Sequence, residues 1–375
     1  MLRVRFSPTS PIGEVSEWFK VQPWKGCGSV RVPQVRILSS PQLLNSLIIR
    51  KVLLNGWELG LNPRASEMAG VRFVYLPPIL IESSFIMTVK IATLVGCAIG
   101  DALGNPFEMK NANHHSILQW DGLFKDGGTF WKGKAGQYTD DTLMSIALSE
   151  SLIENNGFFP EKVAQEYLNW YNSGNTRGIG STTASAMVRL KLGASHLESG
   201  LTDIQCAGNG TAMRAAPIGL FYKDDLSTLL QVAAADASIT HNSLEPKLGS
   251  IAIALGVGLI ANNYNIDSVL NEVEDIIPES DVKMKLTLAK KLLNNNTDPS
   301  DALAEIGTSG YVADSVGAAY YCLASTSNFK DCVMMAVRGG GDTDSIAAIA
   351  GAMAGTYYGL EGIPEEYKVV EDFDL

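Results

Sequence analysis

The sequence predicts an all-α fold for the chain from about Met87 to its end. Segments rich in Ala, Leu and Ile recur there with apolar residues three or four positions apart, which is the spacing of one helix face. Clusters of Gly, Asn, Pro and Asp separate these segments, and the alternation typical of strands is nearly absent. No solenoid repeat divides residues 87–375. We therefore expect one domain, a compact orthogonal helix bundle.

The expected helices follow one another along this domain. Two of them, 91–102 and 346–355, are rich in Gly and Ala, which lets helix backbones approach closely at some cost in helix propensity. We expect these two at the centre of the bundle. In chain order the expected helices span 88–103, 140–154, 160–173, 182–192, 225–239, 246–262, 266–273, 281–294, 301–306, 312–325, 329–338 and 345–357.

The chain before Met87 has a different composition. It has no Asp, ten Lys or Arg and five Glu, so the remainder keeps 19 of the 29 basic residues and 35 of the 40 acidic ones. Residues 13–18 and 34–37 resemble a translated transfer-RNA gene, and one codon choice for 22–27 forms a stem like a serine anticodon arm. We expect that residues 1–86 come from an over-extended reading frame and that Met87 is the true start. The alternative is a disordered basic tail.

The acidic composition excludes some partners and compartments. The formal net charge is −11, whereas nucleic acids and anionic membranes attract an excess of Lys and Arg, so we expect no general nucleic-acid binding. No run approaches the roughly 20 apolar residues of a membrane helix. We expect no membrane association, a cytoplasmic location and a monomer. Without CxxC or zinc-like spacing, the cysteines read as buried reduced thiols: Cys27, Cys97, Cys206, Cys322 and Cys332.

Two similar motifs place carboxylates and hydroxyls at a loop-to-helix junction. Residues 136–142 read Gly-Gln-Tyr-Thr-Asp-Asp-Thr and precede an apolar periodic run. Residues 338–345 read Arg-Gly-Gly-Gly-Asp-Thr-Asp-Ser and precede another. Taken singly, each is well explained by helix capping, since Thr, Ser and Asp are favoured caps and early Asp offsets the helix dipole.

Taken together, the two motifs supply more side-chain oxygen atoms than helix capping needs. They hold four carboxylates and several hydroxyls, and the triple glycine adds a tightly bent backbone. Hard oxygen ligands without His or Cys suit magnesium or manganese rather than zinc. If the two helix starts converge, their carboxylates can bridge a pair of ions. We therefore expect a dinuclear metal site in the bundle.

Weaker signals lie in three other elements. Residues 100–108 pass from a helix end into a Gly/Pro turn that presents Glu108, although a lone Glu there is usually solvated surface. Residues 208–214 form a Gly/Asn loop that can approach a ligand closely, with Arg214 as a cation for phosphate, although such loops are common turns. Residues 238–242 end a helix with His241, and a lone His is usually structural.

In this order and spacing, the five elements resemble the ADP-ribosylglycohydrolase family, and the likeness runs from about residue 89 to 367. The resemblance implies a compact all-α fold that holds two Mg²⁺ or Mn²⁺ ions and acts on ADP-ribosylated proteins or small molecules. It implies Glu108, Asp140 and Asp141 as catalytic residues. The implied metal ligands are Thr139, Asp140, Asp141, Asp342, Asp344 and Ser345, and the implied substrate-binding residues are Gly208, Asn209, Gly210, Thr211, Met213, His241 and Tyr311.

The resemblance also implies a mechanism. As a hypothesis, the metals hold the hydroxyls of the distal ribose and polarise a water that Asp140, Asp141 or Glu108 deprotonates. The bond from ribose to acceptor then breaks through an oxocarbenium-like state. The acceptor stays open: arginine, serine, a nucleic-acid end, a metabolite or a polymer.

Two other functions compete with this one. The first is a non-catalytic member that binds ADP-ribose or has a structural role, because one fold can host several functions. Retention of every ligand type argues against it. The second is a two-metal phosphoesterase, but such sites usually include His, and the four His residues of the chain show no metal-ligand pattern.

Overall fold

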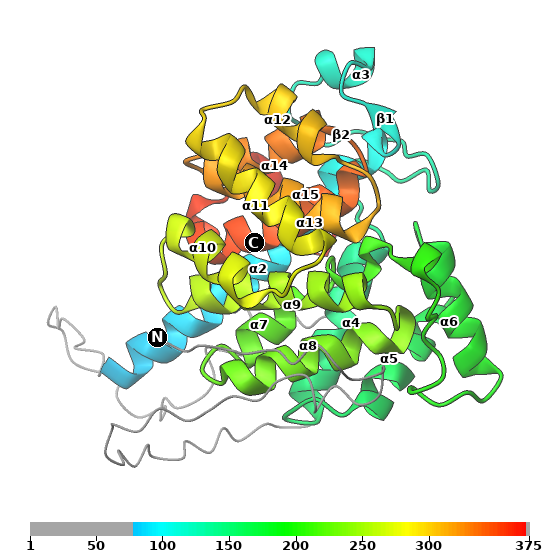
Figure 1. Cartoon of the computed structure of the whole chain (residues 1–375). Helices are drawn as coiled ribbons and strands as arrows, with labels where there is room; N and C mark the ends of the chain where they lie inside the picture. The colour runs from blue at the N-terminus through cyan, green and yellow to red at the C-terminus, as the bar shows by residue number, and fades with distance from the viewer. Residues whose placement is uncertain (1–77, 373–375) are drawn as a thin grey trace, which may run out of the picture.

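The computed structural model describes residues 78–372, and this part of the chain is all-α, as the sequence predicts (Figure 1). The expected reading-frame boundary at Met87 falls inside the first described helix, and residues 1–77 lie outside the described part. The helices are α2 (Pro78–Gly104), α3 (His115–Leu118), α4 (Asp140–Glu154), α5 (Pro160–Asn172), α6 (Ser181–Lys191), α7 (Ala216–Phe221), α8 (Leu226–Thr240), α9 (Leu244–Ala261), α10 (Ile266–Ile276), α11 (Asp281–Asn294), α12 (Pro299–Ile306), α13 (Val312–Ser325), α14 (Phe329–Arg338) and α15 (Thr343–Tyr358).

The expected helices are all present, and those at α4, α11, α13 and α14 have the predicted ends. α2 begins ten residues before its predicted start. The sequence analysis predicted neither the single turn α3 nor α7, and Pro217 and Gly219 of α7 are residue types that usually mark turns. Proline is tolerated there since it lies in the first helical turn, where its missing N–H would have no partner.

Helices α2 and α15 cross at the centre of the bundle with their backbones in contact, as their small residues predict. A Cβ on Gly96 would lie 2.1 Å from the carbonyl oxygen of Gly351. Near the carboxyl end of α2, a Cβ on Gly104 would lie 2.4 Å from Asp344 Cα. The hydroxyl of Thr343 also donates to the carbonyl oxygen of Gly104 over 2.8 Å. The end of α2 is therefore fixed against the start of α15.

Helix α9 is the exception to the expectation that no segment is apolar enough to span a membrane. Its 18 residues have a mean hydropathy of 1.5, so the helix is long and apolar enough to cross a membrane by length and composition alone. However, 72% of these residues are buried inside the protein. Helices α7, α8, α13 and α15 pack around it. Its apolar character is thus explained by its place in the core.

The cysteines of the described part are free thiols, as expected. Cys97, Cys322 and Cys332 are buried. Cys206 is only partly buried, so the expectation of burial is wrong there, and Cys27 lies outside the described residues.

Candidate active site

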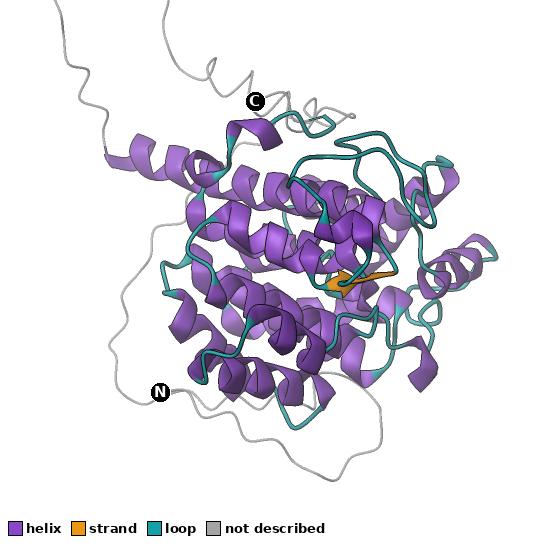
Figure 2. Ribbon diagram, turned by 90° about the horizontal axis from the view of Figure 1, so that it is seen from above, coloured by secondary structure: helices purple, strands orange, loops and turns teal. Residues whose placement is uncertain are grey.

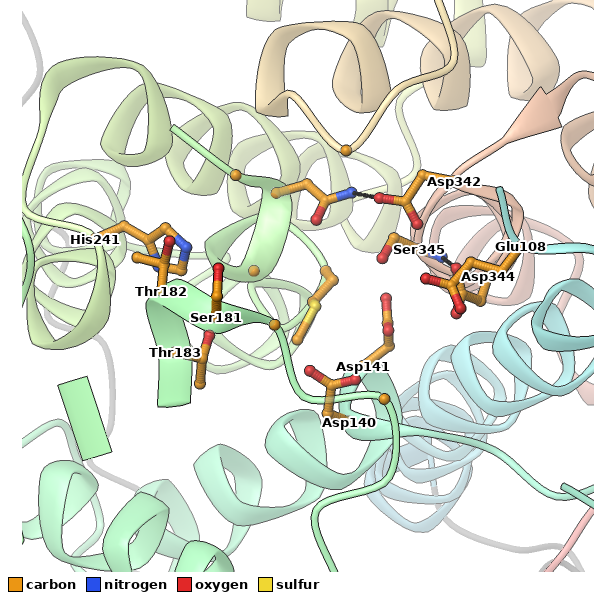
Figure 3. A pocket seen from close by; sticks show the side chains of 17 residues that line it. Glu108, Asp140, Asp141, Ser181, Thr182, Thr183, His241, Asp342, Asp344 and Ser345 are labelled. Atoms are coloured by element: carbon orange, nitrogen blue, oxygen red, sulfur yellow. Dashed lines mark hydrogen bonds between the residues drawn. The ribbon is translucent and has the colours of Figure 1, made fainter. Parts of the chain in front are cut away.

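The starts of α4 and α15 converge, and their acidic side chains face one cavity (Figure 3). Thr139 and Asp342 occupy the N-cap positions of the two helices, but neither side chain caps its own helix. Capping therefore does not explain why these residue types are present. The carboxylates brought together here come from Asp140 and Asp141 on one side and from Asp342 and Asp344 on the other.

The start of α4 is held in place by Asp101 of α2, which is fully buried. Its carboxylate accepts hydrogen bonds from the backbone N–H groups of Thr139 and Thr142, at 2.9 and 3.1 Å. It also accepts from their hydroxyls, at 2.8 and 2.6 Å. Asp140 and Asp141 lie between these two threonines, so Asp101 sets the position of both. Burial raises the pKa of Asp101 to about 6, although the four donors counteract the shift.

Thr139 is placed beside the cavity rather than on its lining. Its Oγ1 lies 2.8 Å from Asp101 Oδ1 and 3.3 Å from Asp141 Oδ2. The hydroxyl has one proton, and the shorter distance assigns it to Asp101. The lone pairs of Oγ1 remain for another partner, so the prediction that Thr139 is a metal ligand stays open.

The start of α15 is held by the Gly/Asn loop. The side-chain amide of Asn209 donates to Asp342 Oδ2 over 2.8 Å and to the hydroxyl of Ser315 over 2.9 Å. The backbone N–H of Asp342 donates to the carbonyl oxygen of Thr308, also over 2.8 Å. The amide donors of Asn209 therefore orient an acidic residue, a role that the sequence analysis did not assign.

Glu108 is tied to the same helix start through a small sheet. Strands β1 (Lys110–Asn111) and β2 (Gly340–Gly341) pair antiparallel, and Figure 2 shows them among the helices. The backbone N–H of Met109 donates to the carbonyl oxygen of Gly341 over 2.7 Å. On the other side, the hydroxyl of Thr129 donates to the carbonyl oxygen of Glu108 over 2.6 Å. This pairing brings the Glu108 carboxylate beside α15.

The acidic residues suit a divalent cation. Oxygens of Glu108, Asp342 and Asp344 lie within 4.8 Å of one another. Asp141 Oδ1 is buried and lacks a hydrogen-bond partner among the described residues. Such an atom is costly unless something else satisfies it. Carboxylate oxygens at this spacing are the donors that Mg²⁺ and Mn²⁺ prefer.

The electrostatics of the cluster point the same way. Burial raises the pKa of Glu108 to about 8, and the charges of Asp342 and Asp101 contribute. Burial, followed by neighbouring carboxylates, also raises the pKa of Asp140, Asp141 and Asp344 well above the ordinary value. Ionised acids packed this closely repel one another, and positive charge among them would offset the repulsion.

The cavity extends from the acidic residues to His241 (Figure 3). Most of the predicted site residues line it, whereas Thr139, Thr211 and Tyr311 do not. Thr211 is buried, and its hydroxyl donates to the carbonyl oxygen of Pro246. The Tyr311 hydroxyl donates to Asp281, while its neighbour Gly310 does line the cavity. The predicted residues on the lining are Glu108, Asp140, Asp141, Gly208, Asn209, Gly210, Met213, His241, Asp342, Asp344 and Ser345.

Sequence reasoning predicted the helix α6 but not the place of its first residues in the site. Ser181, Thr182 and Thr183 line the cavity together with Gly178 and Gly180. Gly180 is the N-cap of α6, and no side chain caps this helix. The signal was present, because residues 178–183 repeat the pattern of glycines and hydroxyls before a helix. The segment has no carboxylate, and the sequence analysis assigned it no functional role.

The expectation that Arg214 offers a cation to phosphate is wrong. Its side chain is fully buried and forms an ion pair with Asp236 over 2.9 Å. It also donates to the carbonyl oxygen of Gly210 and to the hydroxyl of Thr240, at 2.8 and 3.0 Å. A buried arginine needs such partners, since its charge is costly without them. Arg214 thus supports the Gly/Asn loop from behind.

His241 is buried as a neutral imidazole. Burial, with a contribution from the Arg214 charge, lowers its pKa to about 3. Its Nδ1 lies 2.8 Å from the Thr240 hydroxyl, which already accepts a hydrogen bond from Arg214. Thr240 can then donate its own proton to Nδ1, which assigns the imidazole proton to Nε2.

This environment predicts a pH dependence of stability. The pKa of His241 is lower in the folded than in the unfolded chain, so the unfolded chain binds more protons between about pH 6.5 and pH 3. The contribution of His241 to the free energy of unfolding is complete above about pH 6.5. At pH 4 this contribution is lower by about 3 kcal/mol. Urea unfolding of wild type and His241→Asn from pH 7 to pH 4 should show the smaller decrease in the variant. The control is His115→Gln, at an exposed histidine. A His241→Asn variant with the wild-type pH slope would contradict the assignment of this pH dependence to His241.

Comparisons with known proteins agree with this site. A family model described as ADP-ribosylglycohydrolase matches residues 90–372. The ADP-ribosylarginine hydrolase Tri1 of Serratia proteamaculans is 34% identical over 78% of this chain and 77% of its own length. The ADP-ribosyl-[dinitrogen reductase] glycohydrolase of Rhodospirillum rubrum is 29% identical over 73% of this chain and 87% of its own.

A solved structure agrees as well. The structure named ADP-ribosylglycohydrolase-related protein complex shares 27% identity and a TM-score of 0.58, and the match covers 76% of this chain and 92% of that one. The family match includes both acidic helix starts and the Glu108 segment. The chain therefore belongs to the ADP-ribosylglycohydrolase family and is an enzyme of that class.

Proposed function

We propose that this protein is a metal-dependent hydrolase that releases ADP-ribose from a modified arginine side chain. One observation carries the proposal. The cavity joins a cluster of carboxylates at two helix starts to a region with neutral hydrogen-bonding groups around His241. A ligand with a sugar at one end and a nucleoside at the other matches this division.

The acidic end would hold the distal ribose and the divalent ions. Asp140, Asp141, Asp342, Asp344 and Ser345 are the ligand candidates on the cavity lining, with Thr139 adjoining them. When bound, Mg²⁺ or Mn²⁺ supplies positive charge that polarises hydroxyl and water oxygens.

The residues of the chain then account for the proton transfers. Asp140, Asp141 or Glu108 accepts a proton from water, and the water oxygen forms a bond to the anomeric carbon of the ribose. The bond from that carbon to the acceptor nitrogen breaks, and the nitrogen takes up the proton that the carboxylate accepted from water. The products are ADP-ribose and an unmodified side chain. Neighbouring carboxylates favour the positive charge that develops on the sugar.

The start of α6 would hold the diphosphate. Its first backbone N–H groups lack a side-chain cap, and a helix N-terminus attracts negative charge. The hydroxyls of Ser181, Thr182 and Thr183 lie on the same lining. The neutral imidazole of His241 at the far end suits an uncharged nucleoside better than a phosphate.

Arginine is the proposed acceptor because the relative from Serratia proteamaculans, at 34% identity, is named for it. A panel experiment tests this choice. The purified full chain is offered proteins ADP-ribosylated on arginine or on serine, and a nucleic acid ADP-ribosylated at its end, each with Mg²⁺, Mn²⁺ or EDTA. We expect release from arginine with either metal, and loss of release with EDTA.

The other outcomes also have definite meanings. Release from serine alone would refute arginine as the acceptor but would still support the proposed hydrolase activity. Release that persists in EDTA would refute metal dependence. Tight binding of ADP-ribose without release from any substrate would support the non-catalytic alternative and refute the proposal.

A further inference from the structure

One arginine joins the two loops that flank the start of α4. The Arg177 guanidinium donates to the carbonyl oxygen of Tyr138 over 3.2 Å. Its Cζ lies 4.9 Å from the ring centre of Trp131 and 5.9 Å from that of Tyr138. Arg177 also forms an ion pair with Glu371, in which its Nη1 and Nη2 each donate to a different oxygen of the carboxylate. Such two-pronged pairs are directional as well as strong.

Glu371 brings the C-terminal segment 365–372 into this contact. Its carboxylate also accepts from the side-chain amide of Gln137 over 2.8 Å, and its backbone N–H donates to the carbonyl oxygen of Gly136 over the same distance. The segment is anchored by Tyr367 and Val370, which are buried. Thus the segment holds both the loop before α4 and, through Arg177, the loop before α6.

Both loops continue directly into the acidic site. Tyr138 immediately precedes Thr139, whose backbone and hydroxyl are bound by Asp101. Gly178 immediately follows Arg177 and has a φ of +74°; a Cβ there would lie 2.9 Å from Asp140 Oδ1. The backbone at residue 178 therefore lies close to the Asp140 carboxylate and leaves no room there for a larger side chain. A shift of Arg177 would be transmitted to Asp140 from both sides.

The same arginine reaches Glu108 by a second path. Trp131, on which Arg177 stacks, lies in a short loop closed by two backbone hydrogen bonds between Gly127 and Gly133, at 3.0 and 2.9 Å. The loop also carries Thr129, whose hydroxyl donates to the carbonyl oxygen of Glu108. The pair with Glu371 is mostly buried, since the two side chains are 18% and 22% exposed.

We propose that the Arg177–Glu371 ion pair is a positioning device that sets Asp140, and through Trp131 the Glu108 segment, for cation binding. The proposal rests on the proposed metal-dependent function. Neither residue lines the cavity, so the pair acts through the backbone of Tyr138 and Gly178. Partners one step removed from a metal ligand typically change metal affinity by about 10- to 100-fold.

Three variants of the full chain test the proposal. Glu371→Ala removes the pair. Glu371→Gln keeps an acceptor for Arg177 and Gln137 and should restore part of the effect. Glu366→Ala is the matched control, because it removes a second ion pair of the same segment, Lys330 to Glu366 at 2.8 Å, that joins the segment to α14 instead of to either loop.

The first readout is the Mn²⁺ dissociation constant, measured by electron paramagnetic resonance of free Mn²⁺. We expect Glu371→Ala to weaken binding by about tenfold or more, Glu371→Gln by less, and Glu366→Ala not at all. Turnover at saturating substrate and Mn²⁺ should then approach the wild-type value in all three. Equal affinity in Glu371→Ala and wild type would overturn the proposal, and so would equal weakening by the control.

The second readout does not depend on metal. Hydrogen exchange of the backbone amides of residues 139–142 in EDTA should be about tenfold faster in Glu371→Ala than in wild type or Glu366→Ala. Wild type that binds no Mn²⁺ would refute the proposed function, while faster exchange would still support the positioning of this segment. Unchanged exchange would overturn the inference whether or not the protein binds metal.

Discussion

Replacement of Asp344 by Asn should lower the metal-dependent release of ADP-ribose by at least about a thousandfold. The variant keeps the shape of the side chain but removes a carboxylate oxygen that lies within 4.8 Å of oxygens of Glu108 and Asp342. If the proposed function holds, loss of a charge that would hold the metal ions removes several kcal/mol of transition-state stabilisation, and each 1.36 kcal/mol is tenfold in rate. The measurement is initial-rate release from an ADP-ribosylated arginine protein at saturating Mg²⁺ or Mn²⁺.

The same variant should gain stability in EDTA, which separates loss of function from misfolding. Burial and neighbouring acids raise the folded-state pKa of Asp344. Stability from such a group is present below its unfolded pKa and is lost as pH rises, so at neutral pH the ionised acid opposes folding. Asp344→Asn should therefore unfold at a higher temperature than wild type at pH 7.5 in EDTA. Asp301→Asn, at an exposed aspartate, should change neither the turnover nor the unfolding temperature. An Asp344→Asn variant with wild-type turnover would refute the assignment of Asp344 as a metal ligand.

Replacement of Asp101 by Asn should cost about 2–4 kcal/mol of unfolding free energy and most of the activity. The carboxylate accepts from the backbone and hydroxyl groups of Thr139 and Thr142 in a fully buried place. An asparagine amide would turn its own N–H groups toward some of these donors and leave buried groups without partners. Chemical unfolding and initial-rate assays measure the two effects.

A matched control exists at the start of α8. There Asp225 accepts from the backbone N–H and hydroxyl of Thr228, at 3.1 and 2.7 Å, on the exposed surface. Asparagine caps exposed helices about as well as aspartate, so Asp225→Asn should be nearly neutral. If both replacements have the same small effect, the burial argument for Asp101 is wrong.

The sequence predicts the helices well because each has its own apolar face and its own stop signal. α4, α11, α13 and α14 show this most clearly, since their predicted ends agree with the structure. The two acidic motifs are likewise local, and the structure brings both to one cavity. What a single motif could not decide was whether its residues cap a helix or face a ligand. That question depends on side-chain direction, which only the folded arrangement supplies.

The features that sequence analysis missed depend on contacts between distant segments. Asp101 occurs in a helix end that reads as an ordinary stop, and its role appears only when α4 is placed beside it. Arg214 has the charge of a phosphate ligand, but Asp236, 22 residues away, holds it in the core. Arg177 and Glu371 are separated by 194 positions. A pattern that spans so many residues has no period to recognise.

The contact of α2 with α15 also bears on how such a protein can change over generations. The start of α15 lies against the end of α2 where backbone meets backbone, at Gly104 and Asp344, and Asp101 of the same α2 end holds the start of α4. Apolar side chains elsewhere in the core can be exchanged for others of similar volume at modest cost, and such exchanges leave this spacing intact. Substitutions in the core can therefore accumulate independently of substitutions at the acidic site. Sequence change can accumulate in the core of this fold without moving Asp344 relative to the end of α2.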